Sequence, residues 1–299
     1  MSGALNILQF GRSGQLGTEL IATLSRDSGI RTIVLGREEA DFTNASGIEE
    51  AVLKAGTLDV VINAAAYTAV DRAEQEEALA YQVNAEAVGA MARACAARGV
   101  PLIHVSTDYV YDGAKPDPYV ESDPTGPLNA YGRTKLAGEN LIRDRLPAHV
   151  ILRTSWVYSA WGQNFLATML RLGAERDEVR VVDDQRGAPT SAQALAEAIA
   201  AIARQIASPI ANQGAAFGTY HYANAGEASW CDFAAEIFRQ AGLKARAVPI
   251  PSTEYPTPAK RPANSRLDAT KISRIFGIHP PAWQTSLARV LAGMEEKRR

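Results

Sequence analysis

Three glycines near the start of the chain constrain its fold more than any other feature. Gly11, Gly14 and Gly17 form the pattern G-x-x-G-x-x-G between a short apolar run at residues 5–10 and a segment of helical spacing at residues 15–24. In a strand-turn-helix unit, such glycines permit a tight turn, let backbone N–H groups approach a pyrophosphate, and let the helix pack closely on the strand. The pattern therefore predicts a dinucleotide site at the N-terminus of the first helix, where the helix dipole favours negative charge.

The alternation of strand and helix patterns then continues through the first half of the chain. Further strands are predicted at residues 32–35, 59–63, 102–106 and 150–154. Further helices are predicted at residues 45–55, 74–98 and 129–145. This alternation predicts an α/β fold with a Rossmann-type, doubly wound parallel sheet, which binds its ligand at the carboxyl ends of the strands.

The pattern becomes less regular from about residue 161 onward. Predicted elements there are helices at 165–172, 192–206 and 230–241 and strands at 179–182 and 220–223. We therefore expect residues 1–160 to form an NAD(P)-binding domain. Residues 161–299 should form mainly a smaller α+β substrate lobe, with some segments returning to the first domain. A loop at 112–127, rich in Pro and Gly, is expected to face the substrate, although its length also suits a plain surface loop.

Composition excludes several classes of function. The 31 Lys and Arg residues are balanced by 33 Asp and Glu residues, so no excess positive charge is available to hold nucleic acid or an anionic membrane. The chain shows neither a leader pattern nor an apolar run of membrane-spanning length, which favours a cytoplasmic protein. Both cysteines, Cys95 and Cys231, lie in apolar helical patterns and are expected to be buried, reduced thiols. The four histidines lack metal-ligand spacing and are interpreted as packing or surface residues.

Charges after the second predicted strand bear on the choice of cofactor. Arg37 stands where its donors would suit a 2′-phosphate, which favours NADPH. Glu38 and Glu39 follow at once and would repel that phosphate, so NADH stays open. Asp41 and Phe42 next offer a carboxylate and an apolar ring to an adenine.

Tyr131 and Lys135 carry the predicted chemistry. They stand four residues apart in the helix at 129–145 and so share one face. A ketone that accepts a hydride also needs a proton, and a phenol can supply it if nearby positive charge stabilises the phenolate. Thr107, just past the strand at 102–106, would donate a second hydrogen bond to the carbonyl oxygen. These three residues are the predicted catalytic group.

The residue after Asp108 distinguishes reduction from dehydration. Elimination of a hydroxyl requires an acid and a base, which an Asp-Glu pair directly after Thr107 would supply. The chain has Tyr109 at the second of these positions. Simple reduction is therefore the better interpretation.

With these motifs the chain resembles the extended short-chain dehydrogenase/reductases, and among them the dTDP-4-dehydrorhamnose reductases. The resemblance covers nearly the whole chain, including residues 63–71, 105–113, 131–135, 153–158, 183–190, 220–224 and 261–267. With the glycine turn and Arg37, it implies an NAD(P)H site made of Gly11, Arg12, Gly14, Gln15, Leu16, Gly17, Arg37, Asp41, Phe42, Ala65, Ala66, Tyr67, Tyr131 and Lys135.

The resemblance also implies a substrate, a dTDP-linked 4-keto-sugar. Thr107, Asp108 and Trp156 would contact the sugar, with the indole offering a stacking face. Arg186 and Arg261 are the candidates for holding the diphosphate. Some members of the family are dimers bridged by magnesium, but the chain shows no matching carboxylate cluster. We therefore predict no metal and expect a monomer or a homodimer.

The implied reaction is reduction of dTDP-4-dehydro-6-deoxy-L-mannose to dTDP-L-rhamnose. Three alternatives stay open at this point: another nucleotide-sugar 4-keto reductase, an epimerase with tightly held NAD, and a regulatory subunit that binds NADP without turnover. The last of these would be expected to lose its catalytic residues. This chain keeps Thr107, Tyr131, Lys135 and Trp156.

Overall fold

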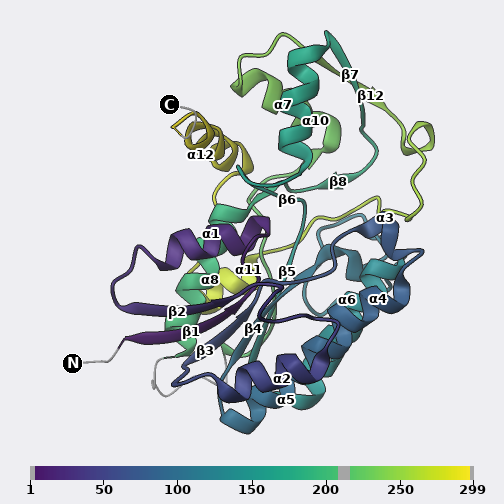
Figure 1. Ribbon diagram of the computed structural model, residues 1–299. Helices are drawn as coiled ribbons and strands as arrows, with labels where there is room; N and C mark the ends of the chain where they lie inside the picture. Colours follow the sequence, from purple (N-terminus) through teal and green to yellow (C-terminus); the bar gives the residue numbers. More distant parts are fainter. Residues whose placement is uncertain (1–3, 208–215, 297–299) are drawn as a thin grey trace.

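A six-stranded parallel sheet forms the centre of the larger, lower lobe in Figure 1, a computed structural model that describes residues 4–207 and 216–296. We call this part the sheet lobe. Its strands are β1 (Leu5–Phe10), β2 (Ile30–Leu35), β3 (Val60–Asn63), β4 (Leu102–Thr107), β5 (His149–Thr154) and β10 (Gly218–His221). Their order across the sheet is β10-β5-β4-β3-β1-β2, which confirms the predicted doubly wound fold. The order reverses between β1 and β3, so a ligand site is expected beside the ends of these two strands.

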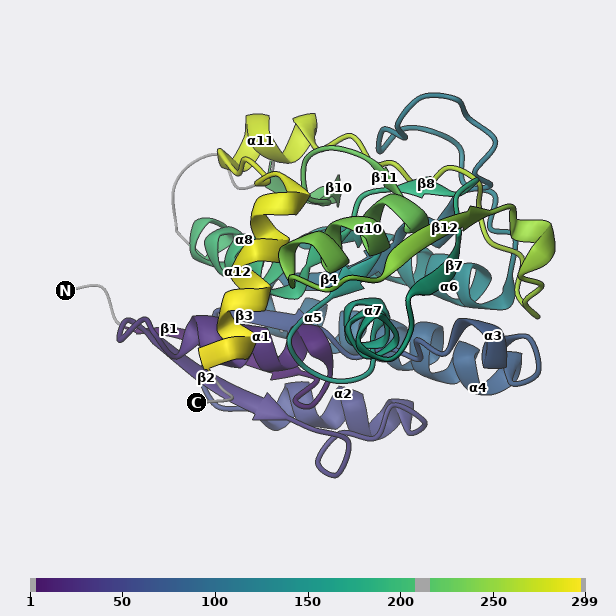
Figure 2. The same ribbon diagram turned by 90° about the horizontal axis from the view of Figure 1, so that it is seen from above.

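Helices cover both faces of this sheet (Figures 1 and 2). One face carries α1 (Gln15–Leu24), α8 (Ala192–Ile206) and α11 (Thr270–Phe276). The other carries α2 (Ala45–Lys54), α5 (Ala87–Arg98) and α6 (Ala130–Arg145). Leu20 and Ile199 are fully buried in the first layer, and Val52 and Met91 in the second. Burial of each apolar stripe against the strands is the main stabilising term for a fold of this kind.

The helix predicted at residues 74–98 is confirmed from residue 77 onward. It consists of α4 (Glu77–Tyr81), the π-helical turn η1 (Gln82–Glu86) and α5, which follow one another without a gap, and a separate short helix, α3 (Val70–Ala73), precedes it. Residues 74–76 separate α3 from α4, and there the Glu74 carboxylate accepts the Ala130 N–H at 2.7 Å, at the start of α6. In η1, the Asn84 side chain bonds both the N–H and the C=O of Tyr67. Tertiary hydrogen bonds therefore accompany the later start of this helix and its π-helical turn.

The upper part of Figure 1, which we call the small lobe, is built from later segments. It contains α7 (Phe165–Glu175), β7 (Glu178–Val182), α10 (Trp230–Gln240), β12 (Arg246–Ile250) and α12 (Trp283–Glu296). Short strand pairs join it to the neighbouring loops: β6 (Val157–Tyr158) with β9 (Thr190–Ser191), and β8 (Arg186–Gly187) with β11 (Ala228–Ser229). Between these small-lobe segments, α8 and β10 return to the sheet lobe, where β10 pairs with β5.

The loop at 112–127 is anchored by its aromatic residues. Tyr119 stacks on Tyr111 with ring centroids 4.1 Å apart, and its backbone bridges to Leu267. No residue of this loop lines the main cavity described below, so the structure gives no support to the expectation that it faces the substrate. Its role in this structure is to tie the sheet lobe to residues 264–268.

Both cysteines are buried and free, as predicted. Burial in the apolar layer under α5 raises the pKa of Cys95 to about 12, so its thiol stays protonated and unreactive. Within residues 4–207 and 216–296, no helix has the length and apolar character needed to cross a membrane.

Candidate active site

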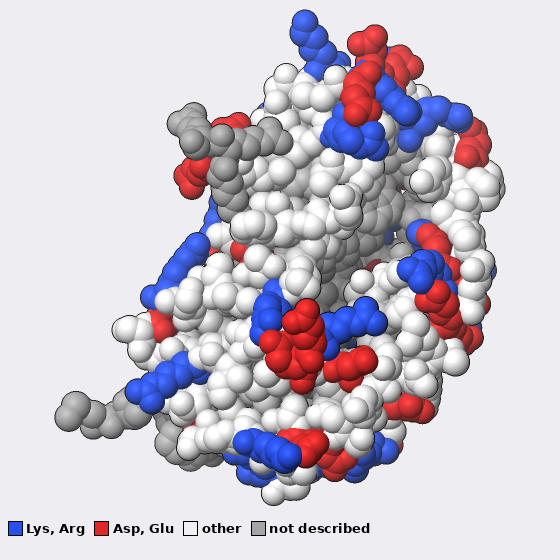
Figure 3. Space-filling model, in the orientation of Figure 1, with Lys and Arg blue, Asp and Glu red and all other residues white. Residues whose placement is uncertain are grey.

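A cavity of about 980 Å³ lies at the carboxyl ends of the central strands. The space-filling view shows a hollow between the two lobes, with basic and acidic side chains gathered below it (Figure 3). The residues that line the cavity come from the turn after β1, the loop after β2, the ends of β3, β4 and β5, and the start of α6. Its position is the one that the strand order predicts for a ligand.

The glycine turn has the geometry that its pattern predicts. Gly11 has φ +99°, which disfavours any residue with a side chain, and a Cβ there would lie 3.0 Å from the backbone of Ala64. A Cβ on Gly17 would lie 2.5 Å from the Gly11 carbonyl oxygen, so this glycine permits the close packing of α1 on the turn. Gly14 differs, because a Cβ there would meet no protein atom within 4 Å. The open space at Gly14, directly at the N-terminus of α1, is what a bound pyrophosphate requires.

Charges of both signs meet at the far end of this cleft. Arg12 and Arg37 both line the cavity. The Arg12 guanidinium donates to Glu39 Oε1 at 2.7 Å, and Glu39 Oε2 accepts the Gly36 N–H at 2.9 Å. The hydrogen bond from Arg12 holds the pKa of Glu39 below its usual range. A carboxylate therefore competes for the guanidinium that a 2′-phosphate would use.

Tyr131 and Lys135 reach the cavity from the first turns of α6. Asn129 caps this helix by accepting the Gly132 N–H at 2.8 Å. A Cβ on Gly132 would lie 2.2 Å from the Tyr109 carbonyl oxygen, so Gly132 lets α6 approach the 3₁₀ turn η2 (Asp108–Val110). This contact brings the ring of Tyr109 edge-on to that of Tyr131, with centroids 5.6 Å apart. The helix start is thereby fixed against the end of β4.

Thr107 and Asp108 complete the reacting end of the cavity. Burial raises the pKa of Tyr131, and a hydrogen bond with Thr107 opposes this effect, so the phenol is held as a proton donor. Thr107 Oγ1 donates to Asp108 Oδ1 at 3.0 Å. Burial also raises the pKa of Asp108 to about 6. Three of the predicted residues, Thr107, Asp108 and Tyr131, therefore surround one point of the cleft.

Trp156 lines the cavity in a strained conformation. Its φ of +49° is the only positive value among the described non-glycine residues. Its ring stacks on Trp230 with centroids 3.7 Å apart, and Gly187 leaves room for it, because a Cβ there would lie 2.5 Å from the indole. Strain of this kind persists only where the surroundings hold it, and it is concentrated at ligand sites.

Several polar side-chain atoms at the cavity have no hydrogen-bond partner within the part of the protein that the structure describes. Among the described residues, eight buried side-chain oxygen or nitrogen atoms lack a partner. Four of them belong to residues that line the cavity: Gln15 Oε1, Ser106 Oγ, Asp108 Oδ2 and Thr154 Oγ1. Leaving a buried polar atom unpaired costs about 1–3 kcal/mol, so these four atoms favour water or a polar ligand in the cleft.

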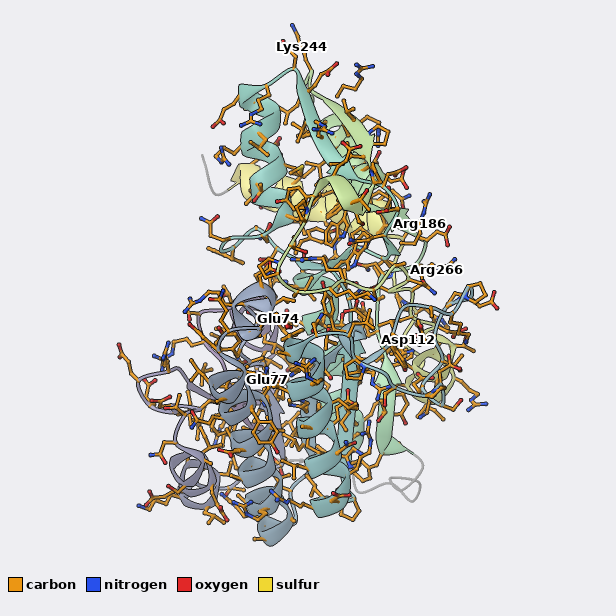
Figure 4. The ribbon with its side chains drawn as sticks, turned by 90° about the vertical axis from the view of Figure 1, so that its right-hand side faces the viewer. Glu74, Glu77, Asp112, Arg186, Lys244 and Arg266 are labelled. Atoms are coloured by element: carbon orange, nitrogen blue, oxygen red, sulfur yellow. The ribbon has the colours of Figure 1, made fainter. Side chains whose placement is uncertain are left out.

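Three predicted site residues lie outside the cavity lining. Gly17 acts through packing, as described above. Arg186 binds Asp232 at 3.1 Å and points to the outside of the molecule (Figure 4). Arg261 forms two hydrogen bonds with Asp71, at 3.1 and 2.9 Å. Their role toward a diphosphate stays a prediction. The other predicted cofactor residues, and Thr107, Asp108 and Trp156, all line the cavity.

Sequence reasoning missed the buried partners of Lys135. Lys135 Nζ donates to the Val105 carbonyl oxygen at 2.7 Å and lies 3.2 Å from His104 Nε2. His104 Nδ1 in turn lies 3.0 Å from the amide nitrogen of Asn63. The register that pairs Asn63 with His104 across β3 and β4 depends on the folded sheet, so the sequence carried no direct signal of it. No group of three His, Cys, Asp or Glu side chains suited to a metal ion occurs in the part of the chain that the structure describes.

Comparison with known proteins identifies the family. The family described as RmlD substrate binding domain matches residues 5–296. The chain belongs to this family. Curated relatives include a dTDP-4-dehydrorhamnose reductase of Sinorhizobium fredii, 45% identical over 94% of this chain and 95% of its own length. That of Salmonella typhimurium is 43% identical over 97% of this chain and 98% of its own length.

Solved structures agree with this assignment. A dTDP-4-dehydrorhamnose reductase from Clostridium acetobutylicum superposes with a TM-score of 0.90 at 36% identity, covering 97% of this chain and all of its own. One from Bacillus anthracis, solved in complex with NADP, has a TM-score of 0.88 at 34% identity and covers 97% of this chain and 99% of its own. The resemblance read from the motifs is thus confirmed at the level of the family.

Proposed function

We propose that this chain reduces the C4 keto group of dTDP-4-dehydro-6-deoxy-L-mannose and so forms dTDP-L-rhamnose, with NADPH as reductant and NADH as the alternative. The observation that carries the proposal is one cleft that holds both the glycine turn and the group Thr107, Tyr131 and Lys135. Relatives that are 43–45% identical over nearly their whole length are dTDP-4-dehydrorhamnose reductases, which supports the proposal. Tyr109, in place of a second acid, favours reduction over dehydration.

In the proposed mechanism the side chains of this chain donate the proton and stabilise the charge that remains. NADPH, when bound, supplies the hydride. Tyr131 donates its phenolic proton to the C4 oxygen, and the Thr107 hydroxyl, turned away from Asp108 Oδ1, donates a hydrogen bond to the same oxygen. The buried setting that raises the pKa of Tyr131 keeps the phenol protonated until the oxygen gains charge. A positive charge on Lys135 stabilises the phenolate that remains.

We assign the cofactor and the substrate mainly to different parts of the chain. Residues 1–160, with later segments, would bind the cofactor, and residues 161–299 would mainly bind the substrate. The glycine turn would hold the pyrophosphate, and Asp41 and Phe42 would contact the adenine. Trp156 would offer its indole face to the hexose, while Asp108 Oδ2, which has no partner, would accept a sugar hydroxyl.

The proposed function is tested by measuring how much cofactor is consumed for each sugar converted. Purified protein is mixed with the dTDP-4-keto-sugar and either NADPH or NADH, and loss of nicotinamide absorbance is followed together with sugar products. We expect one NADPH consumed for each sugar reduced. An epimerase would change the sugar without net consumption, and a regulatory subunit would bind NADPH without either change. Either result would overturn the proposal.

Glu39 is expected to set the cofactor preference. Glu39→Gln removes the charge that occupies Arg12 and should raise the kcat/KM ratio of NADPH to NADH by about tenfold. Steady-state kinetics with both cofactors measures this ratio. Glu38→Gln is the matched control, because Glu38 is the exposed neighbouring acid and the Arg12 guanidinium pairs with Glu39. An unchanged ratio in Glu39→Gln would contradict the assignment.

Gly14 is expected to matter for the cofactor and little for the fold. Gly14→Val places a side chain in space that the protein leaves open, so the chain should fold while the Kd for NADPH rises at least about tenfold. Gly56→Val is the control, since a Cβ there also meets no atom within 4 Å but Gly56 lies outside the cleft. Fluorescence titration with NADPH gives both affinities. Equal affinity in Gly14→Val and the parent would remove the pyrophosphate from this turn.

A further inference from the structure

The buried contact between His104 and Lys135 has a defined hydrogen-bond direction. His104 is fully buried in β4, with Asn63 on its Nδ1 side and Lys135 on its Nε2 side. Burial, the larger cause, lowers the pKa of His104 well below its ordinary value, and a charge on Lys135 would lower it further, so with either form of the lysine the ring is neutral and carries one proton. The position of that proton decides what Lys135 faces.

Asn63 fixes the position of the proton. The backbone N–H of Ala65 lies 3.0 Å from one terminal atom of the Asn63 side chain, and because an N–H can only donate, that atom is the oxygen. The amide NH₂ of Asn63 therefore faces His104 at 3.0 Å and donates to Nδ1. Nδ1 is the acceptor, and the ring proton lies on Nε2.

An Nε2–H bond then points at the lysine nitrogen, 3.2 Å away. An ammonium group has three N–H donors and no acceptor, so it could not accept the hydrogen bond from Nε2–H, and the two donors would repel each other. A neutral amine presents a lone pair that can accept the Nε2–H. We propose that His104 is a positioning residue for Lys135: held by Asn63 as the Nε2–H tautomer, it stabilises the neutral amine of Lys135 relative to the ammonium.

The other surroundings of Lys135 differ in whether they favour its charged or its neutral form. Glu139, one turn further along α6, favours the ammonium, although its carboxylate is shared with Arg143 and Arg153. Burial opposes the charge and dominates, which lowers the pKa of Lys135 to about 8. The remaining titratable groups nearby are Tyr131 on α6, Asp108 in η2, whose charge acts on Tyr131, and His149 on β5, whose charge acts on His104. The Nε2–H tautomer acts in the same direction as burial, against the ammonium form of Lys135.

Nitrogen NMR tests the tautomer without any turnover. In cofactor-free protein labelled with ¹⁵N-histidine, we expect the His104 Nε2 signal to be of the protonated type and the Nδ1 signal of the unprotonated type. In Asn63→Asp the carboxylate can still accept from Ala65 but must also accept from His104, so the two signals should exchange types. Histidine-to-glutamine variants assign the signals. A proton on Nδ1 in the parent protein would overturn the proposal.

The pH profile of kcat tests the effect on Lys135, and this arm rests on the proposed function. If the ammonium is needed for turnover, kcat falls as pH rises through the pKa of Lys135. Asn63→Asp and His104→Phe should both shift this alkaline limb upward, by about one pH unit. His149→Gln, which removes a different buried histidine, should leave the limb in place.

The two variants separate the tautomer from the added charge. A shift in Asn63→Asp alone, with His104→Phe at the parent value, would assign the effect to the new carboxylate and overturn the proposal. If the parent shows no turnover, the proposed function fails, and the NMR result still decides the tautomer. Circular dichroism establishes that each variant is folded.

Discussion

Tyr131→Phe should lower kcat by about 10²–10⁴-fold, the range in which a positioned general acid contributes to proton transfer. The phenylalanine ring keeps the edge contact with Tyr109, so the fold and the affinity for NADPH should change little. Only the proton donor is lost. Steady-state kinetics gives the loss in kcat, and fluorescence titration gives the unchanged cofactor affinity.

Tyr158→Phe is the matched control for this variant. Tyr158 is also buried, and its hydroxyl has no hydrogen-bond partner, but it does not line the cleft. Its kcat should stay within about twofold of the parent, because the lost group takes no part in the chemistry. Near-normal turnover in Tyr131→Phe would remove the phenol from the mechanism.

Arg153→Met should lower the free energy of unfolding by about 3–5 kcal/mol, because it leaves a buried carboxylate without its main partner. Glu139 is fully buried and binds Arg153 through hydrogen bonds of 3.0 and 2.6 Å. Arg153 also donates to the Tyr111 hydroxyl at 2.6 Å, which links α6 and β5 to the residues that precede the loop at 112–127. Urea denaturation at pH 7 measures the change.

The pH dependence of this pair has a definite sign. Hydrogen bonds and charge from Arg153 hold the pKa of Glu139 below its ordinary value in the folded state. The pair therefore stabilises the parent protein above the ordinary pKa of a glutamate, near 4.5, and this contribution is lost as the pH falls through the folded value. Arg153→Met should lack that acid-sensitive contribution.

An exposed ion pair provides the control for Arg153→Met. Arg171 and Glu175 lie one helical turn apart in α7 with side chains 60% and 53% exposed, so Arg171→Met should cost less than about 0.5 kcal/mol. Replacing both Arg153 and Glu139 with Met should recover part of the loss, since no buried charge is left alone. A cost below about 1 kcal/mol in Arg153→Met would contradict this account.

Local pattern was sufficient to predict most of the fold. The glycines of residues 11–17 and the repeated strand-helix alternation predicted the parallel sheet, because each signal depends on neighbouring residues alone. The later start and the π-helical turn of the helix predicted at 74–98 were not predictable in this way. They go with the contacts of Glu74 to Ala130 and of Asn84 to Tyr67, which are brought together only by the fold.

The same distinction between local pattern and long-range contact applies to the residues of the candidate site. Residues that follow directly on a strand or sit at the start of a helix, such as Thr107 and Tyr131, could be placed in the cleft from the sequence. The acidic partners of Arg186 and Arg261 come from distant segments, so their pairing was not foreseen. His104 was interpreted as a packing residue because a lone histidine in an apolar strand carries no signal of the lysine it will meet.

Isotope transfer tests the central claim most directly. The protein is given the dTDP-4-keto-sugar and NADPH carrying deuterium at both C4 positions of the nicotinamide, and the product is examined by mass spectrometry and NMR. The account predicts dTDP-L-rhamnose with one deuterium at C4 of the sugar. A product without deuterium at that carbon, or no product at all, would contradict it.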